Sequence, residues 1–539
     1  MEENFEFKKN KSNLKISFER IAFIFFIFFF IAIIFSSKTI YLSLKKKPDT
    51  KNIVKKEKFR ASIMDRDGNI LAKTVRVTNL GINPNQVINK DKLLISLKLI
   101  FPDKNFNKQL NGDKFFYIKK KISPEKLEKI KLLGEKSIRE EDNIARVYPN
   151  RNLFSHILGQ IDTDNNGVSG IEKSFDYELT TSKDPLNLTL DTELQYMTRV
   201  ELLRYQDIFK SYGSTAILMN INNGEILSMV SLPDFDLNKR ENILDKRFIN
   251  RSTKGIYELG SVFKTFTLAA GLQENVIEVD TLFENLPKKL KCAGRSISEY
   301  DLDIPSNLTA EQILIRSGNI GSIKIAQMVG LEKFKGFLED LDLVNKTKFD
   351  IEEVGNPIPF KWGKCKLATS AYGHGITTTP LQLAKAYAII ANGGYKVNPT
   401  LIKKKEKLKK GEQIISEQNS KKINNILRKI VTSSAGTANL ANIEGYEIAG
   451  KTGTAQKSIE GKYSNKKVNT FASIFPINEP KYVLIVMLED TKLSKSYVYN
   501  YRNKPGSFVG TPFNTAGWTS VEVAAKIIEK IGPILATKY

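Results

Sequence analysis

Histidine and cysteine are scarce in this chain, which contains only two of each among 539 residues. The histidines, His156 and His374, are far apart in the sequence, and His374 lies between two glycines, which is typical of a rim or packing residue. So few imidazole and thiol groups leave no cluster with the spacing of a metal site. We therefore expect no metal and no cofactor, and we do not expect a histidine to act as a catalytic base.

The two cysteines, Cys292 and Cys365, are compatible with two states. In an oxidising compartment they could form a disulfide, provided that the fold brings them within reach of each other. Free buried thiols fit the sequence equally well, and both states stay open.

The chain has a formal net charge of +24, which by itself would be compatible with nucleic-acid binding. Lysine is, however, spread along the whole chain beside abundant asparagine and isoleucine, and even the lysine run at 403–410 is no more than a local peak. We interpret this as a compositional bias and expect no nucleic-acid partner. Attraction to anionic lipids or wall polymers is a milder consequence of the same charge.

One long apolar run lies near the amino end, from Ile21 to Phe35. About fifteen residues span only about 22 Å as a helix, so the helix must continue toward Leu42 to cross a bilayer. The bulky residues around Phe35 offer no small-x-small cleavage site, which favours a retained anchor over a cleaved signal peptide. Lysines flank the run on both sides, so charge alone gives no orientation.

A chain of this length exceeds one ordinary core, so we expect two or more domains after the anchor. The predicted order is a polar tail (1–20), a transmembrane anchor (21–42), a lysine-rich linker (43–58), a mixed α/β domain (59–185) and a larger domain (186–539).

The larger domain has the pattern of an α+β fold. A helix is predicted after Asp191, and 215–221 and 225–230 form a predicted hairpin around Asn222-Asn223-Gly224. Further strands are predicted around Ile448, around Phe471 and over 482–488. Five strands with helices before, between and after them indicate an antiparallel sheet covered on both faces.

A Ser-x-x-Lys element at Ser261 and Lys264 opens an apolar-periodic stretch that predicts a buried helix beginning at the serine. The same pattern also occurs at Ser12, Ser43, Ser123 and Ser464. On a helix the two side chains share one face, and the lysine can act as a base only when it is neutral. Desolvation or a second cation would lower its pKa, and Lys451 is the obvious cation. Alone, the element fits an ordinary helix N-cap.

Two further short elements follow it. Ser317-Gly318-Asn319 comes after a helical stretch that opens with capping-box spacing, so we place it in the connection to the next helix. Lys451-Thr452-Gly453-Thr454 follows a predicted strand, and its glycine indicates close approach of a ligand or another backbone. Each alone has a plain structural explanation, a turn and an edge-strand kink.

Together the three elements resemble the motif set of penicillin-binding proteins and their serine β-lactamase relatives. The resemblance covers nearly the whole chain: Tyr372-Gly373-His374-Gly375 and 379–384 look like the active-site rim and helix of class B members, and 60–72 and 146–172 like their non-catalytic pedestal. Residues 449–457 look most like the FtsI-type division transpeptidase. The chain differs from the usual pattern of this family at two positions: it has Leu259 where many relatives have proline, and Ala61 where glycine is usual. Neither difference affects the expected chemistry.

The resemblance implies the chemistry of the site. Ser261 would attack the carbonyl between the last two D-alanines of a peptidoglycan stem peptide and form an acyl-enzyme. Lys264 would take the serine proton, and Ser317 and Lys451 would relay a proton to the leaving D-alanine. A second strand's amine would then accept the acyl group and form the cross-link.

Substrate binding is implied in the same way. The backbone N–H groups of Ser261 and Thr454 would form the oxyanion hole. Asn319 would hold the stem-peptide amide. Thr452, Gly453 and Thr454 would form the substrate-binding stretch, whose threonines grip the terminal carboxylate.

The resemblance also implies a location and partners. The protein would be a single-pass inner-membrane protein with a cytoplasmic tail and a periplasmic catalytic domain on a pedestal. β-Lactams would be covalent inhibitors. Divisome proteins would be its partners, among them a membrane glycosyltransferase, since no polymerase motif occurs in this chain.

Three alternatives stay open. The first is an elongation-type class B transpeptidase acting on the side wall. The second is a β-lactam hydrolase or sensor with the same acylation machinery, which would need a way to activate water. The third is a non-catalytic scaffold that has kept the fold, against which the intact motif residues argue.

Overall fold

The computed structural model of the chain describes residues 18–44, 59–239, 245–292, 295–404, 410–459, 462–502 and 505–539. The chain divides into two units, Met1–Lys58 and Phe59–Tyr539. The predicted linker and most of the predicted tail lie outside the described residues, as does most of the lysine run at 403–410.

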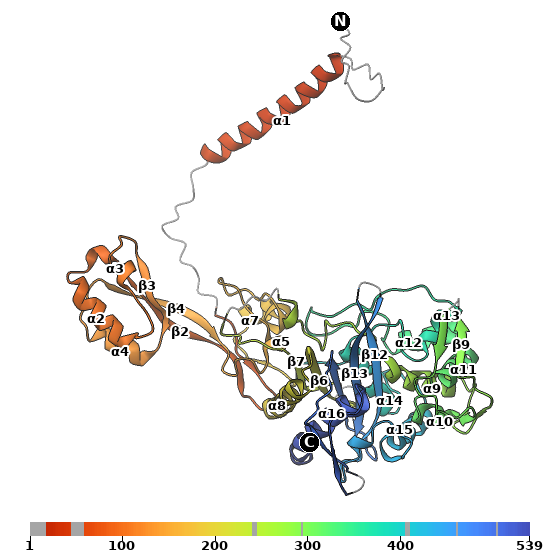
Figure 1. Cartoon of the computed structure of the whole chain (residues 1–539). Coiled ribbons are helices and arrows are strands. Elements are labelled where there is room, and N and C mark those ends of the chain that lie inside the picture. The colour runs from red at the N-terminus through yellow and green to blue at the C-terminus, as the bar shows by residue number, and fades with distance from the viewer. Residues whose placement is uncertain are drawn as a thin grey trace. The chain divides into compact units, whose positions relative to one another are not determined.

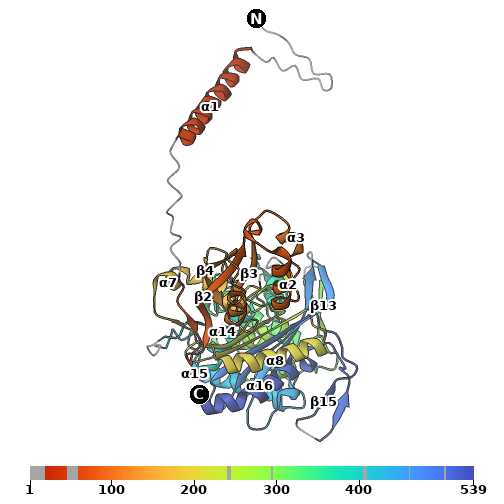
Figure 2. The same cartoon turned by 90° about the vertical axis from the view of Figure 1, so that its left-hand side faces the viewer.

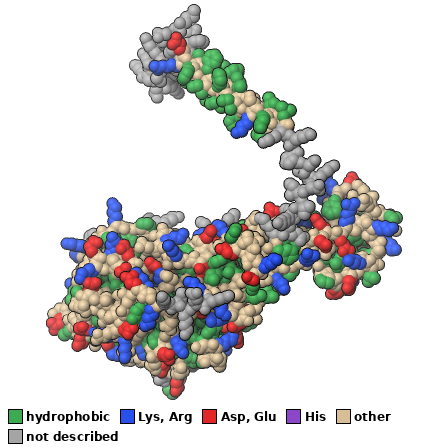
Figure 3. Space-filling view, turned by 180° about the vertical axis from the view of Figure 1, so that it is seen from behind, with side chains coloured by type: hydrophobic (Ala, Val, Ile, Leu, Met, Phe, Trp, Pro, Cys, Tyr) green, Lys and Arg blue, Asp and Glu red, His purple; other side chains and the backbone are tan. Residues whose placement is uncertain are grey.

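The described part of the first unit is helix α1 (Phe18–Leu44), which contains the predicted anchor. Its large apolar side chains are exposed along its whole length, as Figure 3 shows in green. Among the described residues, Glu19–Leu44 is the segment long and apolar enough to cross a membrane. A helix that is apolar on all sides fits lipid better than a protein surface in water.

The second unit opens with a mixed five-stranded sheet. Strand β2 (Ile70–Ile82) is long because it pairs first with β1 (Ile63–Met64) and then with the whole length of β4 (Ile138–Val147), from Lys73↔Val147 to Ile82↔Ile138. The other strands are β3 (Phe116–Ile122) and β5 (Leu186–Asn187). The helices here are α2 (Lys90–Ile100), α3 (Asn107–Leu110), α4 (Pro124–Lys131), α5 (Ser155–Leu158), α6 (Gly170–Ser174) and α7 (Asp176–Thr181), with a 3-10 turn at Pro84–Gln86. These short elements match the prediction for the pedestal, whose boundary at residue 185 stays a prediction.

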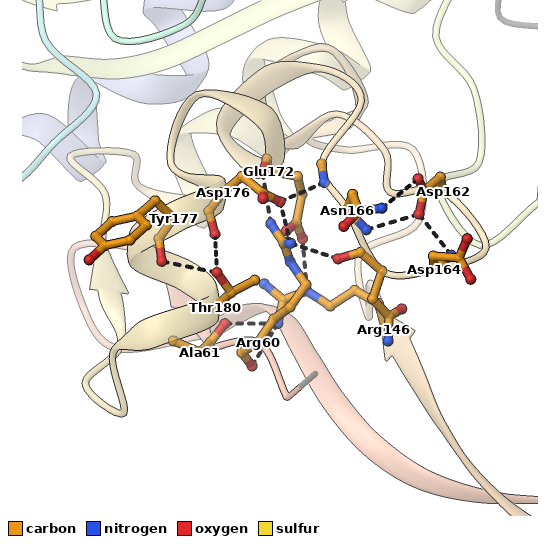
Figure 4. A network of polar contacts seen from close by, with 12 residues as sticks. Arg60, Ala61, Arg146, Asp162, Asp164, Asn166, Glu172, Asp176, Tyr177 and Thr180 are labelled. Carbon is orange, nitrogen blue, oxygen red and sulfur yellow. Dashed lines mark hydrogen bonds and ion pairs between the residues drawn. The ribbon is translucent and has the colours of Figure 1, made fainter. Parts of the chain in front are cut away.

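A buried charge network ties the start of this region together (Figure 4). Each carboxylate oxygen of Glu172 accepts from one guanidinium, at 2.9 Å from Arg60 Nε and 2.7 Å from Arg146 Nε. Arg60 also reaches Asp176, 2.6 Å from Nη1 to Oδ1. The side chains of Arg60, Arg146 and Glu172 are at most 1% exposed. Arg146 therefore depends on Glu172 for its counter-charge, and Arg60 shares its charge between Glu172 and Asp176.

Replacing Glu172 with alanine is expected to lower the free energy of unfolding by about 3–5 kcal/mol, because two buried guanidinium groups lose their shared partner. Thermal unfolding of the purified protein in detergent measures the effect. Glu125→Gln is the control, since the Glu125–Lys129 pair is exposed and its loss should leave the melting temperature unchanged. Equal melting temperatures for both variants would contradict the role given to the network.

The larger sheet has five antiparallel strands in the order β12-β13-β14-β6-β7. Its strands are β6 (Gly213–Asn220), β7 (Ile226–Leu232), β12 (Ala449–Ile459), β13 (Lys462–Phe475) and β14 (Tyr482–Glu489). The predicted hairpin and the three later strands are therefore confirmed. Since β12 forms one edge of the sheet, one side of its backbone is free to meet other segments.

Helices cover both faces of this sheet, as predicted. On one face α8 (Thr192–Ile208), the helix expected after Asp191, lies beside α16 (Ser520–Lys538) (Figure 2). On the other face lies α14 (Pro380–Ala391), which is buried along its whole length. Helix α15 (Glu417–Thr432) packs against β12. The helices α10 (Ala310–Ile315), α11 (Asn319–Val329), α12 (Leu331–Asp340) and α13 (Lys364–Ser370) pack mainly against one another and against other helices of the domain.

The remaining elements are short. Three two-stranded sheets pair β8 (Leu282–Phe283) with β11 (Leu308–Thr309), β9 (Lys289–Cys292) with β10 (Arg295–Ser298), and β15 (Val498–Asn500) with β16 (Ser507–Val509). The 3-10 turns in this part are Lys246–Phe248, Gly260–Phe263, Asn439–Ala441 and Ala516–Trp518.

Candidate active site

Ser261 lies in a 3-10 turn, Gly260–Phe263, and helix α9 (Lys264–Gln273) begins directly after it. The predicted helix is thus present but begins three residues after the serine. Gly260 has a φ of +63°, a conformation that favours glycine, and a Cβ there would lie 2.8 Å from the Thr454 carbonyl oxygen. The turn that carries Ser261 therefore rests directly on the edge strand β12.

Gly453, on strand β12, also allows the strand and the turn of Ser261 to approach closely. A Cβ at Gly453 would lie only 2.2 Å from the carbonyl oxygen of Leu259, which confirms the predicted close approach of another backbone. The Thr454 carbonyl faces Gly260, and the N–H and C=O of one strand residue point to the same side of the strand. The Thr454 N–H therefore points away from β13, from the edge of the sheet toward the turn of Ser261.

Ser317 brings the other two motifs together. It lies between α10 and α11, as predicted, and its φ of +56° is uncommon for a residue with a side chain. Its hydroxyl oxygen is 2.9 Å from Lys451 Nζ and 3.2 Å from Lys264 Nζ. The amine of Lys264 also donates to the Ser317 carbonyl and, at 2.7 Å, to Asn319 Oδ1. The Ser317 hydroxyl therefore lies between the amines of Lys264 and Lys451.

Both lysines are almost fully buried, at 1% exposure for Lys264 and 0% for Lys451. Burial lowers the pKa of Lys264 to about 7, while the nearby Glu299 carboxylate acts in the opposite direction. Burial, and then the charge of Lys264, lowers the pKa of Lys451 well below its ordinary value. Desolvation, one of the two causes that the sequence suggested, is therefore the largest cause of the low pKa of Lys264. The two amines also lie on either side of the Ser317 hydroxyl, so the charge of each disfavours the charged form of the other.

Glu299 is a residue of this site that the sequence did not reveal. Its two carboxylate oxygens accept the first backbone N–H groups of α11, from Asn319 at 2.6 Å and Ile320 at 2.8 Å. The Asn319 side chain also donates to the carbonyl of Ser298, at 2.8 Å. The only sequence signal is that Gly318, at the N-cap, has no side chain to cap the helix.

The threonines of the third motif have partners within the fold. Thr452 Oγ1 is 2.6 Å from the hydroxyl of Thr437, and Thr454 Oγ1 accepts from the Ala516 N–H at 2.9 Å. Both side chains are thereby held on the edge strand next to Lys451 and Ser261. Sequence reasoning missed Thr437, which lies outside all three motifs.

The predicted rim is present, and its histidine packs as expected. His374 stacks on Tyr463, with ring centroids 4.6 Å apart, and its Nδ1 is 3.6 Å from Glu258 Oε2. The Gly375 N–H donates to the same Glu258 carboxylate at 2.9 Å. Glu258 precedes the 3-10 turn of Ser261, so the predicted rim segment is attached to the segment that carries Ser261.

The two cysteines form a disulfide, which decides between the two states left open by the sequence. The bond joins β9 to α13, two segments 73 residues apart.

Comparison with known proteins agrees with this geometry. Residues 214–505 match the family described as the penicillin binding protein transpeptidase domain, and residues 55–199 match the penicillin-binding protein dimerisation domain. Over 500 residues the chain is 28% identical to "Probable peptidoglycan D,D-transpeptidase FtsI" of Caulobacter vibrioides, which covers 89% of this chain and 82% of that protein.

Two other relatives have similar coverage. Over 480 residues the chain is 27% identical to "Peptidoglycan D,D-transpeptidase FtsI" of Escherichia coli, covering 81% of this chain and 80% of that protein. Over 496 residues it is 29% identical to "Stage V sporulation protein D" of Bacillus subtilis, covering 81% and 75%. Because the transpeptidase match spans more than half of its length, this chain belongs to the penicillin-binding protein family, with the pedestal and transpeptidase domains of class B and a likeness to the FtsI type.

Proposed function

We propose that this protein is a membrane-anchored peptidoglycan D,D-transpeptidase that cross-links stem peptides through an acyl-enzyme on Ser261. The observation that carries the proposal is the pair of buried amines, Lys264 and Lys451, on either side of the Ser317 hydroxyl. Such a site can take a proton from one hydroxyl and deliver one to a leaving amine without histidine. The names of the relatives support the same substrate.

In the acylation step, Ser261 Oγ bonds to the carbonyl carbon between the two terminal D-alanines. Its proton passes to the neutral amine of Lys264, whose low pKa makes the neutral form abundant near neutral pH. The C–N bond to the last D-alanine breaks, and this amine receives a proton through Ser317 and Lys451. A second stem peptide's amine then attacks the ester, forms the cross-link and frees Ser261.

Binding is proposed for the residues around this path. The outward N–H of Thr454 and the N–H of Ser261 stabilise the oxyanion, a contribution of about 3–4 kcal/mol in comparable sites. Asn319 holds the stem-peptide amide. The substrate carboxylate binds at Thr452, Gly453 and Thr454.

The pH dependence of acylation follows from Lys264. Because only the neutral amine accepts a proton, the acylation rate is expected to rise with pH through about 7. At about pH 5 roughly 1% of the amine is neutral, so the rate there should be about 100-fold below its alkaline plateau. Stopped-flow or gel-based kinetics with a fluorescent penicillin measures the profile. A rate that falls as the pH rises from about 5 to 8 would contradict a neutral lysine base.

Labelling with a fluorescent penicillin, followed by peptide mapping, tests the proposed function most directly. We expect a lasting adduct on the peptide that contains Ser261, together with release of D-alanine from a pentapeptide substrate. Rapid turnover of the penicillin would favour a β-lactam hydrolase instead. An adduct on any other residue would refute the site.

The proposed location is the inner membrane, with the catalytic domain in the periplasm at the division septum. The apolar helix α1 supports membrane attachment, and the Cys292–Cys365 disulfide supports an oxidising compartment. The septal role rests on the resemblance to FtsI-type proteins, as do the divisome partners, a membrane glycosyltransferase among them. A fluorescent fusion should give a steady mid-cell band, whereas patches along the side wall would indicate elongation.

A further inference from the structure

The Cys292–Cys365 disulfide lies where two segments that contact the active site come together. It joins β9, the first strand of the β9–β10 hairpin, to α13, with the two Cα atoms 5.6 Å apart. Figure 1 shows β9, α11 and α13 in the same part of the molecule. Both cysteines are partly exposed, so a reductant in solution can reach the bond.

The hairpin reaches the catalytic lysine through Asn319. At the end of β10, Ser298 and the following Glu299 make three hydrogen bonds to Asn319 and Ile320, at 2.6 to 2.8 Å. The Asn319 side chain then accepts from Lys264 Nζ at 2.7 Å. The Lys264 amine also donates to Ser317, so its position depends in part on where the end of the hairpin lies.

In its described residues, the hairpin is attached to the rest of the domain by a few contacts: Leu290 and Ile297 are partly buried against the main core, and β10 contacts α11. Strands β9 and β10 form a separate two-stranded sheet, and β9 alternates between exposed and half-buried residues. By itself a two-stranded hairpin is only marginally stable in water, so a covalent bond to a packed helix adds to the order that these few contacts give it.

Helix α13 reaches the other side of the reaction centre. Lys366, next to Cys365, donates from its amine to the carbonyl of Gly375, whose N–H donates to Glu258 at 2.9 Å. After the helix, the Ala371 carbonyl accepts from Thr267 Oγ1 of α9 at 2.7 Å. The disulfide thus links the segment that positions the base to the segment that supports the nucleophile's turn.

We propose that the Cys292–Cys365 disulfide positions the acylation site, by holding the hairpin so that Ser298 and Glu299 keep Asn319 and the Lys264 amine in place, and that opening the bond slows acylation. The inference rests on the proposed roles of Ser261 and Lys264. Opening requires a dithiol reductant, whose thiolate attacks one sulfur and whose second thiol closes its own disulfide. Cys292 and Cys365 are left as two thiols, and the protein becomes sensitive to the redox state of its compartment.

The test compares the full-length protein in detergent in three forms: oxidised, reduced by a dithiol below its melting temperature, and carrying Cys292→Ser with Cys365→Ser. The second-order rate of labelling by a fluorescent penicillin is the readout. In the reduced protein and the double variant it should fall by about 10- to 100-fold, the size of effect expected from a small misplacement of a catalytic group. Reoxidation should restore the rate, and the reductant should leave the double variant unchanged.

The pH profile separates positioning of the base from a general effect on the fold. The charged groups near Lys264 are Glu299 and Lys451, and burial is the main cause of its low pKa. A loosened hairpin admits water, so the midpoint of the profile should move from about 7 to higher pH, and the rate should recover in part at alkaline pH. An unchanged rate and midpoint in the reduced protein would overturn the proposal. So would unfolding of the reduced protein at the assay temperature, since the bond would then act on the fold.

A carboxylate variant tests the hairpin without touching the disulfide. Glu299→Gln retains the shape of the side chain but offers one oxygen to two N–H groups, so labelling should slow while the disulfide stays intact. Because the Glu299 charge raises the pKa of Lys264, its removal should move the midpoint to lower pH, opposite to reduction. Glu311→Gln is the matched control, because it breaks an ion pair between Glu311 on α10 and Lys429 on α15. It should change neither the labelling rate nor the midpoint of the pH profile. Failure of the oxidised wild-type protein to label Ser261 at all would instead refute the proposed function.

Discussion

A Ser261→Ala protein is expected to take up no fluorescent penicillin and to release no D-alanine, a loss of at least about 10⁴-fold, because alanine has no atom that can form the ester. The side chain lies in a turn between β12 and α9 and is only partly buried, so the substitution leaves the packing of its neighbours in place. Kinetics of labelling and of D-alanine release measure the loss, and the melting temperature should stay that of the wild type.

Ser123→Ala is the matched control for this substitution. Ser123 has a lysine three residues later, as Ser261 does, but it precedes helix α4, where its side chain makes no capping hydrogen bond. Its removal should leave labelling unchanged. Substantial acylation of the Ser261→Ala protein would mean that another residue is the nucleophile.

The second large effect is expected for Lys264→Met, which replaces the amine by an uncharged side chain of similar length. Loss of a general base typically costs about 10²- to 10⁴-fold in rate, and labelling should slow by that factor while Ser261 remains the modified residue. Time courses followed to completion, with peptide mapping at the end, distinguish slow acylation from none.

Lys264→Arg tests whether the site needs a proton-accepting amine at this position or only a positive charge. A guanidinium stays protonated at any pH that the protein tolerates, so it can donate to Asn319 but cannot take the serine proton. We expect this variant to be as slow as Lys264→Met, and Lys126→Met, at the equivalent position of the Ser123 pattern, to be unaffected. An arginine variant that labels at the wild-type rate would show that a neutral amine is not required.

Local patterns predicted the framework of the catalytic domain. The alternation around Asn222-Asn223-Gly224 predicted the β6–β7 hairpin, and the apolar stretch of 482–488 predicted β14, because strand pairing around a tight turn depends on neighbouring residues. The capping box of Thr309 and Gln312 likewise begins α10 where it was expected. The helix after Ser261 was predicted with its start three residues early, since a 3-10 turn and an α-helix share the same sequence pattern.

Residues far apart in the sequence were harder to relate. Glu299 caps α11 from 20 residues away, and no motif connects it with Asn319. The β9–β10 and β15–β16 hairpins were not predicted, because their strands of three or four residues carry too little pattern.

The sequence by itself determined the three short motifs, the order in which they occur, and that an apolar helix precedes them, because these depend on residue type and local spacing. Only the tertiary structure decided that Cys292 and Cys365 pair, that Glu299 holds the helix of Asn319, and that burial governs the pKa of Lys264. Burial and proximity arise from contacts between segments distant in the chain: Ser317 is 53 residues from Lys264 and 134 from Lys451. Such contacts exist only once the whole domain has folded.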